Sequence, residues 1–390
     1  MISLVNAMQK FSKLNLIILG FSSTAFLLIL FATLRFVRKE TTQRQTKVDW
    51  SPLIVSLNAL FIAGWPFYVT GLGVTPSGFN SRFTLPFIFG AAILVAFLLD
   101  EVRINWVTAV LFSAIVGSSI GYHFTTQNSF RMVTADNTRT IYELLWRVPG
   151  LKPGTTLVTN EGSEYFTYST LAAQLNLIYP PDSGNKISYG WIWPKELSQL
   201  TSDPITAGQA FSEDLIPYPF FGNTSKLIAI QVRPNSCLRV ITSDSIKIEK
   251  SLDNYGVHLI SDPSLIDLNQ EQKFLDISAF GSEPYHGWCY YYEKTDLALQ
   301  KGDFQAIIEN YDQVQKKSLA PLQPEEWLPF IEGLGIVGKL QDALEISQNL
   351  LATQNGDQQI TYGVCSAWRK INKINPSSDV SSVMKQLACP

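Results

Sequence analysis

The sequence has few of the residues that usually carry catalysis or bind metals. Among 390 residues there are only three histidines and four cysteines, namely His123, His258, His286, Cys237, Cys289, Cys365 and Cys389. The histidines are spread along the chain, so a histidine-based triad or metal cage is not expected. No two cysteines have C-x-x-C spacing, which argues against a zinc ribbon or a thioredoxin-type site. Because a Gly-rich phosphate loop and a serine or cysteine nucleophile motif are also lacking, we expect no metal and no cofactor.

All four cysteines lie in the second half of the chain. If that half is in an oxidising compartment, one or two disulfides form, with a pairing that the sequence does not determine. Buried unpaired thiols are the open alternative.

Charge is distributed unevenly between the two parts of the chain. Residues 1–129 hold nine Lys or Arg and four Asp or Glu, whereas residues 130–390 hold 21 and 29. This asymmetry predicts a membrane part followed by a separate solvated part. The acidic second part disfavours nucleic acid as a partner, because phosphate binding needs clustered positive charge.

Stretches without charge predict four membrane-spanning helices in a domain of residues 1–125, at 14–34, 50–71, 83–99 and 106–122. The first stretch, between Lys13 and Arg35, has 21 uncharged residues, and about 20 helical residues cross a bilayer core. A signal peptide is the alternative. The run is longer than the apolar region of a signal peptide, however, and arginines follow it in place of a cleavage site, so we favour a span.

The loop after the first predicted span sets the orientation. Its sequence, RFVRKETTQRQTK, holds five basic residues and one acid, so the positive-inside rule makes it cytoplasmic. Counting spans from there places everything after Phe124 outside the cytoplasm. The N-terminus, with Lys10 and Lys13, is then also outside, a mild exception that further helices upstream would explain.

Residues 126–285 combine helix and strand signals and predict an extracytoplasmic α/β domain. The segment TRTIYELLWRV predicts a helix that stops at Pro149-Gly150, and TTLVT, SKLIAIQV and CLRVI predict short strands. The stretches YPPDSGNKISYGWIWP and LIPYPFFGN are rich in Pro, Tyr and Trp, and we expect them to be long surface loops.

Residues 286–390 contain a repeated pattern. The segment GDFQAIIENYDQV begins at Gly302 and GKLQDALEISQNL begins at Gly338, 36 residues later. An aromatic-bearing helix is expected before each, and a period near 34 is typical of tetratricopeptide (TPR) repeats. The sequence therefore predicts TPR-like helical repeats, which either bind a peptide or form a cap on the α/β domain. We favour the cap.

Two groups of residues are weak candidates for chemistry. His286 and Cys289 could place two metal ligands on one helical face, but two ligands do not make a site, and an ordinary helix start is favoured. Glu161 and Glu164 could form an acid/base pair. A helix start capped by Ser163, with the carboxylates near the positive end of the helix dipole, is favoured instead.

Arg82 is the strongest candidate. It lies in SRFTLP, at the outer end of the third predicted span. A cation at a membrane interface beside a helix start suits a phosphate, such as that of a lipid carrier. The alternative is an arginine that extends to ordinary lipid headgroups, and this is favoured when Arg82 is considered alone.

Several segments together resemble a known family. GFNSRFTLPFIFGAAILVAFLL resembles the late R-[YF]-x-x-P helix of membrane glycosyltransferases with a GT-C fold, the dolichyl-phosphate-mannose–protein mannosyltransferase-like group. WRVPGLKPGTTLVTNE, the segment around CLRV, and WCYYYEKTDLALQKGDF with EEWLPFIEGLGIVGK resemble the C-terminal half of large bacterial members. The resemblance covers most of residues 70–370.

The resemblance implies a polyprenyl-phosphate-linked sugar donor and catalytic carboxylates in the first extracytoplasmic loop. This sequence departs from that pattern, because MISLVNAMQKFSK and GLGVTPSGFNS contain no Asp or Glu. Four spans are also fewer than the fold uses. We therefore expect the C-terminal portion, or a non-catalytic subunit, of such a transferase. A protein partner would supply the catalytic helices, and Arg82 alone carries over, as a lipid-phosphate contact. The alternative is a non-enzymatic envelope scaffold whose repeats bind a partner protein.

Overall fold

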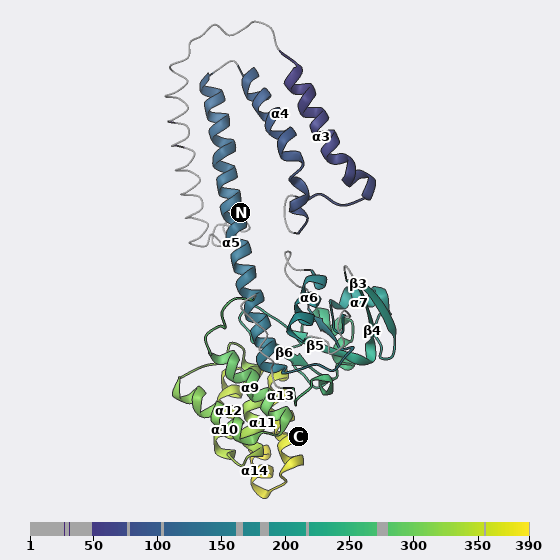
Figure 1. Cartoon of the computed structure of the whole chain (residues 1–390). Coiled ribbons are helices and arrows are strands. Elements are labelled where there is room, and N and C mark those ends of the chain that lie inside the picture. Colours follow the sequence, from purple (N-terminus) through teal and green to yellow (C-terminus); the bar gives the residue numbers. More distant parts are fainter. Residues whose placement is uncertain are drawn as a thin grey trace. The chain divides into compact units, whose positions relative to one another are not determined.

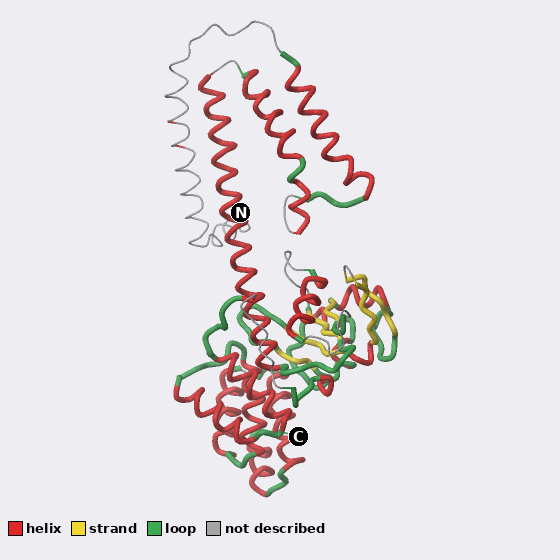
Figure 2. The backbone as a smooth tube through the Cα atoms, in the orientation of Figure 1, coloured by secondary structure: helices red, strands yellow, loops and turns green. Residues whose placement is uncertain are grey.

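The computed structural model describes residues 27, 31, 49–75, 79–102, 105–160, 167–179, 187–215, 218–270, 280–354 and 356–389. Within this part the chain is mostly helical, with a small mixed sheet, as Figure 2 shows in red and yellow. It divides into two compact units, residues 1–134 and residues 135–390. The two units are described separately.

The first unit is built from α3 (Ser51–Thr70), η1 (Phe79–Thr84), α4 (Phe87–Glu101) and the first part of α5 (Asn105–Arg147). Helices α3 and α4 pack side by side as an antiparallel pair (Figure 1). At one end the rings of Trp50 and Phe97 have centroids 6.0 Å apart, and at the other Phe67 lies 5.3 Å from Phe83. Aromatic contacts therefore fix both ends of the pair.

The middle of the α3–α4 pair depends on a glycine. A Cβ atom on Gly90 would lie 2.8 Å from the Leu60 Cγ and 3.0 Å from the Leu60 backbone nitrogen. Only a residue without a side chain permits this close approach, which is a common device where helices pack in membranes.

Among the described residues, two helices are long and apolar enough to cross a membrane, namely α3 and the part of α5 that begins at Trp106. Few of their residues are buried within the protein. Large side chains of α3 such as Phe61 and Ile62 are 67% and 68% exposed. Apolar surface of this extent suits contact with lipid.

The other two predicted spans have different outcomes. Residues 14–34 lie outside the described residues, apart from Leu27 and Phe31. The predicted span 83–99 begins later than expected, because residues 79–84 form a 3₁₀ helix and Pro86 precedes α4 as its N-cap. Helix α4 has 15 residues, which is about 22 Å at 1.5 Å per residue. The four-span bundle therefore stays a prediction.

The prediction that the helix of the fourth span ends at Tyr122 is wrong. Helix α5 continues to Arg147 and has 43 residues. The polar residues after Tyr122 end the apolar surface, but residues 123–138 contain no Gly or Pro that would end a helix. The separate helix predicted at TRTIYELLWRV is thus the last part of α5.

The second unit contains an α/β part. Its elements in chain order are β1 (Thr156–Thr159), α6 (Tyr168–Ile178), β2 (Gly190–Ile192), α7 (Pro194–Leu200), β3 (Ala210–Leu215), β4 (Tyr218–Asn223), η2 (Thr224–Lys226), β5 (Leu227–Gln231), β6 (Arg239–Ile241), α8 (Lys250–Asn254), η3 (Val257–Leu259) and η4 (Pro263–Leu265). The sheet order is β2-β1-β5-β6, with β1 parallel to β2 and β5 and with β6 antiparallel to β5. Strands β3 and β4 form a separate antiparallel hairpin. All residues of β1 and β5 are buried, as expected for parallel strands covered on both faces.

The strands predicted at TTLVT, SKLIAIQV and CLRVI are confirmed as β1, β5 and β6. The prediction that the two aromatic-rich stretches are loops is wrong in part, because GWI forms the buried strand β2 and YPFFGN forms β4. Pro219 is tolerated in β4 because a two-stranded hairpin has only edge strands, each with one side free of ladder hydrogen bonds.

The helical part of the second unit comprises α9 (Trp288–Lys301), α10 (Phe304–Lys316), η6 (Pro324–Trp327), α11 (Leu328–Ile336), α12 (Leu340–Thr353), α13 (Gln358–Ile374) and α14 (Ser378–Gln386). Gly302 and Gly338 both adopt left-handed φ values, 71° and 85°, at the turns where the repeats begin. Ile307 and Ala343 occupy equivalent repeat positions, and both are fully buried. These matches support a repeat, and the TPR-like assignment stays a prediction.

Candidate functional site

Arg82 lies on η1, the short helix between α3 and α4. Its guanidinium carbon is 5.1 Å from the centroid of the Phe83 ring, close enough for a cation–π contact. Phe83 in turn packs against Phe67 of α3. The ring therefore links the position of the cation to the helix pair, while the Arg82 side chain itself is exposed.

The electrostatic setting of Arg82 is simple. It is the only Asp, Glu, Lys or Arg in residues 50–99. Arg82 therefore supplies the whole formal charge of this segment, +1. Its role as a lipid-phosphate contact stays a prediction.

The metal hypothesis for His286 and Cys289 is wrong. Cys289 is bonded to Cys237 and cannot act as a thiolate ligand. The His286 Nε2 lies 2.9 Å from the Glu283 Oε1, and the imidazole stacks on Tyr290 at a centroid distance of 3.7 Å. Within the described residues, no group of three or more His, Cys, Asp or Glu side chains could hold a metal ion.

The candidate acid/base pair Glu161 and Glu164, and the candidate cap Ser163, lie outside the described residues. Whether they form an acid/base pair or a capped helix start therefore stays a prediction.

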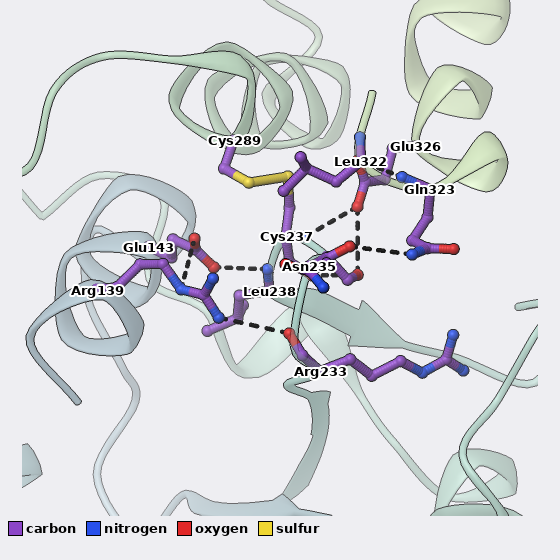
Figure 3. The surroundings of a disulfide bond; sticks show 11 residues. Arg139, Glu143, Arg233, Asn235, Cys237, Leu238, Cys289, Leu322, Gln323 and Glu326 are labelled. Carbon is purple, nitrogen blue, oxygen red and sulfur yellow. Dashed lines mark hydrogen bonds and ion pairs between the residues drawn. A yellow bond between two sulfur atoms is a disulfide. The ribbon is translucent and has the colours of Figure 1, made fainter. Parts of the chain in front are cut away.

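The four cysteines form two disulfides, Cys237–Cys289 and Cys365–Cys389. The first joins the segment before β6 to the start of α9 (Figure 3), and the second joins α13 to the residues after α14. Two disulfides are typical of an oxidising compartment.

Buried carboxylates hold the segment around Cys237 on two sides (Figure 3). The Glu326 Oε1 accepts hydrogen bonds from the Cys237 backbone nitrogen at 2.8 Å and from the Ser236 hydroxyl at 3.2 Å. The Glu143 Oε2, from the end of α5, accepts one from the Leu238 backbone nitrogen at 2.8 Å. We assign these two acids a structural role, because each accepts a hydrogen bond from a backbone N–H group.

A groove of about 740 Å³ lies on the helical part, bordered by α10, the turn before α11, and α12. Tyr311 and Trp327 supply aromatic surface, and Asp342 and Glu345 supply negative charge. Burial and then the charges of Asp342 and Glu345 raise the pKa of Tyr311, which indicates that both acids act on the groove surface. Among the described residues, no Lys or Arg lines this groove.

A further buried acid lies in the α/β part and was missed by the sequence reasoning. Burial, and after it the charge of Glu196, raise the pKa of Glu213 to about 7. Within the described part of the chain, neither carboxylate oxygen of Glu213 has a hydrogen-bond partner. The alternation in AFSEDL puts Glu213 on the same face as the buried Phe211. That alternation would have revealed the buried acid, had the strand been recognised.

Glu213 generates a pH prediction. The unfolded chain loses this proton near pH 4.5, whereas the folded chain keeps it to about pH 7. The folded state therefore binds more protons between these values, so stability falls as pH rises through this window. At pH 8 we expect Glu213→Gln to unfold at a higher temperature than the unchanged protein. Its free energy of unfolding should be larger by at most about 3 kcal/mol. The two should unfold alike near pH 4.

Thermal unfolding of the full chain in detergent, followed by tryptophan fluorescence at pH 4, 6 and 8, measures this. Asp214→Asn is the matched control, since Asp214 is the exposed neighbour on the same strand. An equal loss of stability with pH in the Glu213→Gln and unchanged proteins would contradict the assignment.

The described residues thus offer an exposed arginine beside apolar helices and an acidic, aromatic groove. The first suits an anion and the second a cationic partner. Comparison of the chain with protein-family models, with curated proteins and with solved structures finds no match.

Proposed function

We propose that this chain is a membrane-anchored, GT-C glycosyltransferase-like component that binds the phosphate of a polyprenyl-phosphate-linked sugar at Arg82. In this proposal it is non-catalytic by itself, and a partner protein supplies the helices that carry the catalytic carboxylates. The observation that carries the proposal is that Arg82, on the turn between α3 and α4, is the only charged residue in residues 50–99.

The chemistry of arginine fits this role. A guanidinium presents paired N–H donors that match two phosphate oxygens, and it is more weakly hydrated than an ammonium group. At the end of two apolar helices it meets lipid headgroups rather than bulk water alone. A lipid-linked phosphate diffusing in the membrane plane would reach it there.

The proposal includes a multi-pass topology with residues 135–390 outside the cytoplasm. The loop of residues 35–47, with five basic residues and one acid, supports a cytoplasmic position. Helices α3 and α4 are antiparallel, so a cytoplasmic start of α3 would direct Arg82 outward. The two disulfides support an oxidising location for the second unit.

Arg82→Gln should weaken binding of a polyprenyl phosphate about tenfold, the loss of roughly 1.4 kcal/mol that one charge-assisted contact supplies. The full chain in nanodiscs is labelled with a photoreactive undecaprenyl phosphate, and the apparent Kd is read from labelling. Arg131→Gln is the control, since Arg131 is another exposed arginine of the first unit. Undecaprenol, which lacks the phosphate, should label weakly.

Equal labelling of the Arg82→Gln and unchanged chains would show that Arg82 contacts ordinary headgroups only. Equal competition by phosphatidylglycerol would show that the site recognises any lipid phosphate. Sugar transfer by the purified chain without a partner would overturn the non-catalytic part of the proposal.

The proposed topology predicts that all four cysteines are oxidised in the cell. Protein denatured directly from cells in the presence of a maleimide-polymer reagent should show no mass shift, and four shifts after reduction. Cys389→Ser should show one shift without reduction, because its partner Cys365 is then free. Modification of the unchanged protein before reduction would place the second unit in a reducing compartment.

A second candidate function is a scaffold that docks a partner protein in the groove along α10 and α12. The groove combines Asp342 and Glu345 with the aromatic Tyr311 and Trp327, and its amide side chains suit peptide backbone: Gln315, Gln323, Asn349 and Gln354. An extended, cationic peptide segment is the occupant that this charge favours.

The scaffold function predicts that a fluorescent ten-residue peptide rich in Lys and Arg binds the full chain at least tenfold more tightly than its Glu-rich counterpart. Combined Asp342→Asn and Glu345→Gln changes should remove that preference, and salt should weaken it. Glu309→Gln on the exposed face of α10 and Arg82→Gln are the controls that should leave binding unchanged. The scaffold function fails if both peptides bind equally or if the groove variants bind like the unchanged chain.

A further inference from the structure

A second cavity lies inside the unit of residues 135–390, where the sheet meets the helical part. Its volume is about 350 Å³, near the lower end of the ~300–1,000 Å³ typical of small-molecule sites. Its walls come from the end of α5, the segment from β6 to Ile246, η4, α9, η6 with α11, and α13. We call it the central cavity.

Charged side chains of both signs line the central cavity in nearly equal number. The three cations and four carboxylates are Arg147, Arg239, Lys370, Asp244, Asp296, Glu325 and Glu332. Their charges nearly cancel, so the cavity as a whole attracts neither an anion nor a cation strongly.

Each cation already has an acidic partner. The Arg147 Nε lies 2.5 Å from the Asp296 Oδ2, and the Lys370 Nζ lies 2.8 Å from the Asp244 Oδ2. Arg239 is paired with Glu325 at a longer N···O distance of 3.4 Å. A phosphate or carboxylate ligand would have to displace these acids, and an ammonium ligand would have to displace the cations.

The buried groups of the cavity nevertheless have hydrogen-bonding capacity left. Arg147 donates through Nε and Nη1, and Arg239 donates through Nη1 and Nη2. Among the described residues this leaves Nη2 of Arg147, Nε of Arg239 and the hydroxyl of Tyr292 without an acceptor. All three residues are at least nine-tenths buried and line the cavity.

Acceptors are available on the same walls. The Glu325 carboxylate receives its hydrogen bonds from Arg233 and Arg239 on Oε1, and Asp296 receives one from Arg147 on Oδ2. The remaining carboxylate oxygens can accept hydrogen bonds from a ligand. Unpaired donors and acceptors in a buried site are costly until a ligand or water satisfies them.

Part of the remaining wall is apolar. It consists of aliphatic and proline side chains, namely Val240, Ile246, Pro263, Leu299, Leu328, Pro329 and Ala367. Uncharged polar groups are added by Thr242, Ser245, Gln300 and Ser366. A suitable ligand therefore has no net charge, groups that both donate and accept hydrogen bonds, and apolar C–H faces. Sugars combine these three properties.

We propose that the central cavity binds a neutral mono- or disaccharide. Arg147, Arg239 and Tyr292 donate to its hydroxyl oxygens, and Glu325 and Asp296 accept from its hydroxyl groups. This site goes beyond the proposed function, because it lies in the second unit and needs neither Arg82 nor a lipid phosphate.

Saturation-transfer difference NMR on the full chain tests the site. The protein is held in a detergent without sugar headgroups, so that the detergent does not compete. The probes are glucose, N-acetylglucosamine and maltose as neutral sugars, glucose 1-phosphate as the anion and glucosamine as the cation. We expect saturable signals from at least one neutral sugar and at least tenfold weaker binding of both charged probes.

Two variants complete the test. Tyr292→Phe removes only the hydroxyl and should weaken binding at least fivefold. Tyr291→Phe is the matched control, because the adjacent Tyr291 hydroxyl accepts a hydrogen bond from Lys317 and does not line the cavity. Ser366→Phe should fill the cavity and abolish the signal while the unfolding temperature stays near that of the unchanged chain.

The proposal is overturned if no neutral sugar gives a saturable signal, if glucose 1-phosphate or glucosamine binds more tightly than the neutral sugars, or if Tyr292→Phe binds like Tyr291→Phe. Arg82→Gln should leave sugar binding unchanged. The saccharide site and the lipid-phosphate contact can therefore fail independently.

Discussion

The second unit depends on one buried carboxylate, that of Glu326. The side chain is fully buried, and such a charge would cost several kcal/mol without partners. One oxygen accepts from Cys237 and Ser236, and the other accepts from the backbone nitrogens of Leu322 and Gln323. These four bonds offset the cost of burial only while the approach to β6 lies against the turn before α11. The sheet and the helices are therefore held in one arrangement, which the Cys237–Cys289 disulfide reinforces.

The position of the central cavity depends on these hydrogen bonds of Glu326. Arg239 lies two residues after Cys237, and Glu325 directly precedes Glu326. The contact of Glu326 with Cys237 therefore positions both members of the Arg239–Glu325 ion pair. The cavity lies where these charged side chains meet at the junction. A junction closed entirely by apolar packing would leave no polar space between the sheet and the helices.

Periodicity in the sequence was sufficient to predict much of the fold, including three strands and the helices of the repeat region. It failed where tertiary contacts override local pattern. Glu143 is 1% exposed although it lies opposite the helical stripe of Ile141, Leu144 and Leu145. Its carboxylate accepts a hydrogen bond from the Leu238 backbone nitrogen, a contact distant in sequence. Arg82 could be singled out from sequence because it is the only charge in its segment. The central cavity could not, since six separate segments of the chain contribute its walls.

Arginine has different roles in the two proposed sites. Arg82 is the only charged residue in residues 50–99, and the proposed lipid contact uses its charge to attract a phosphate. Arg147 and Arg239 each face an acid, so their charge is already offset and only their spare N–H donors remain. Such donors distinguish ligands by hydrogen-bond geometry rather than by charge. The two proposed ligands, a lipid phosphate at Arg82 and an uncharged sugar in the central cavity, therefore differ in charge and would not compete for one site.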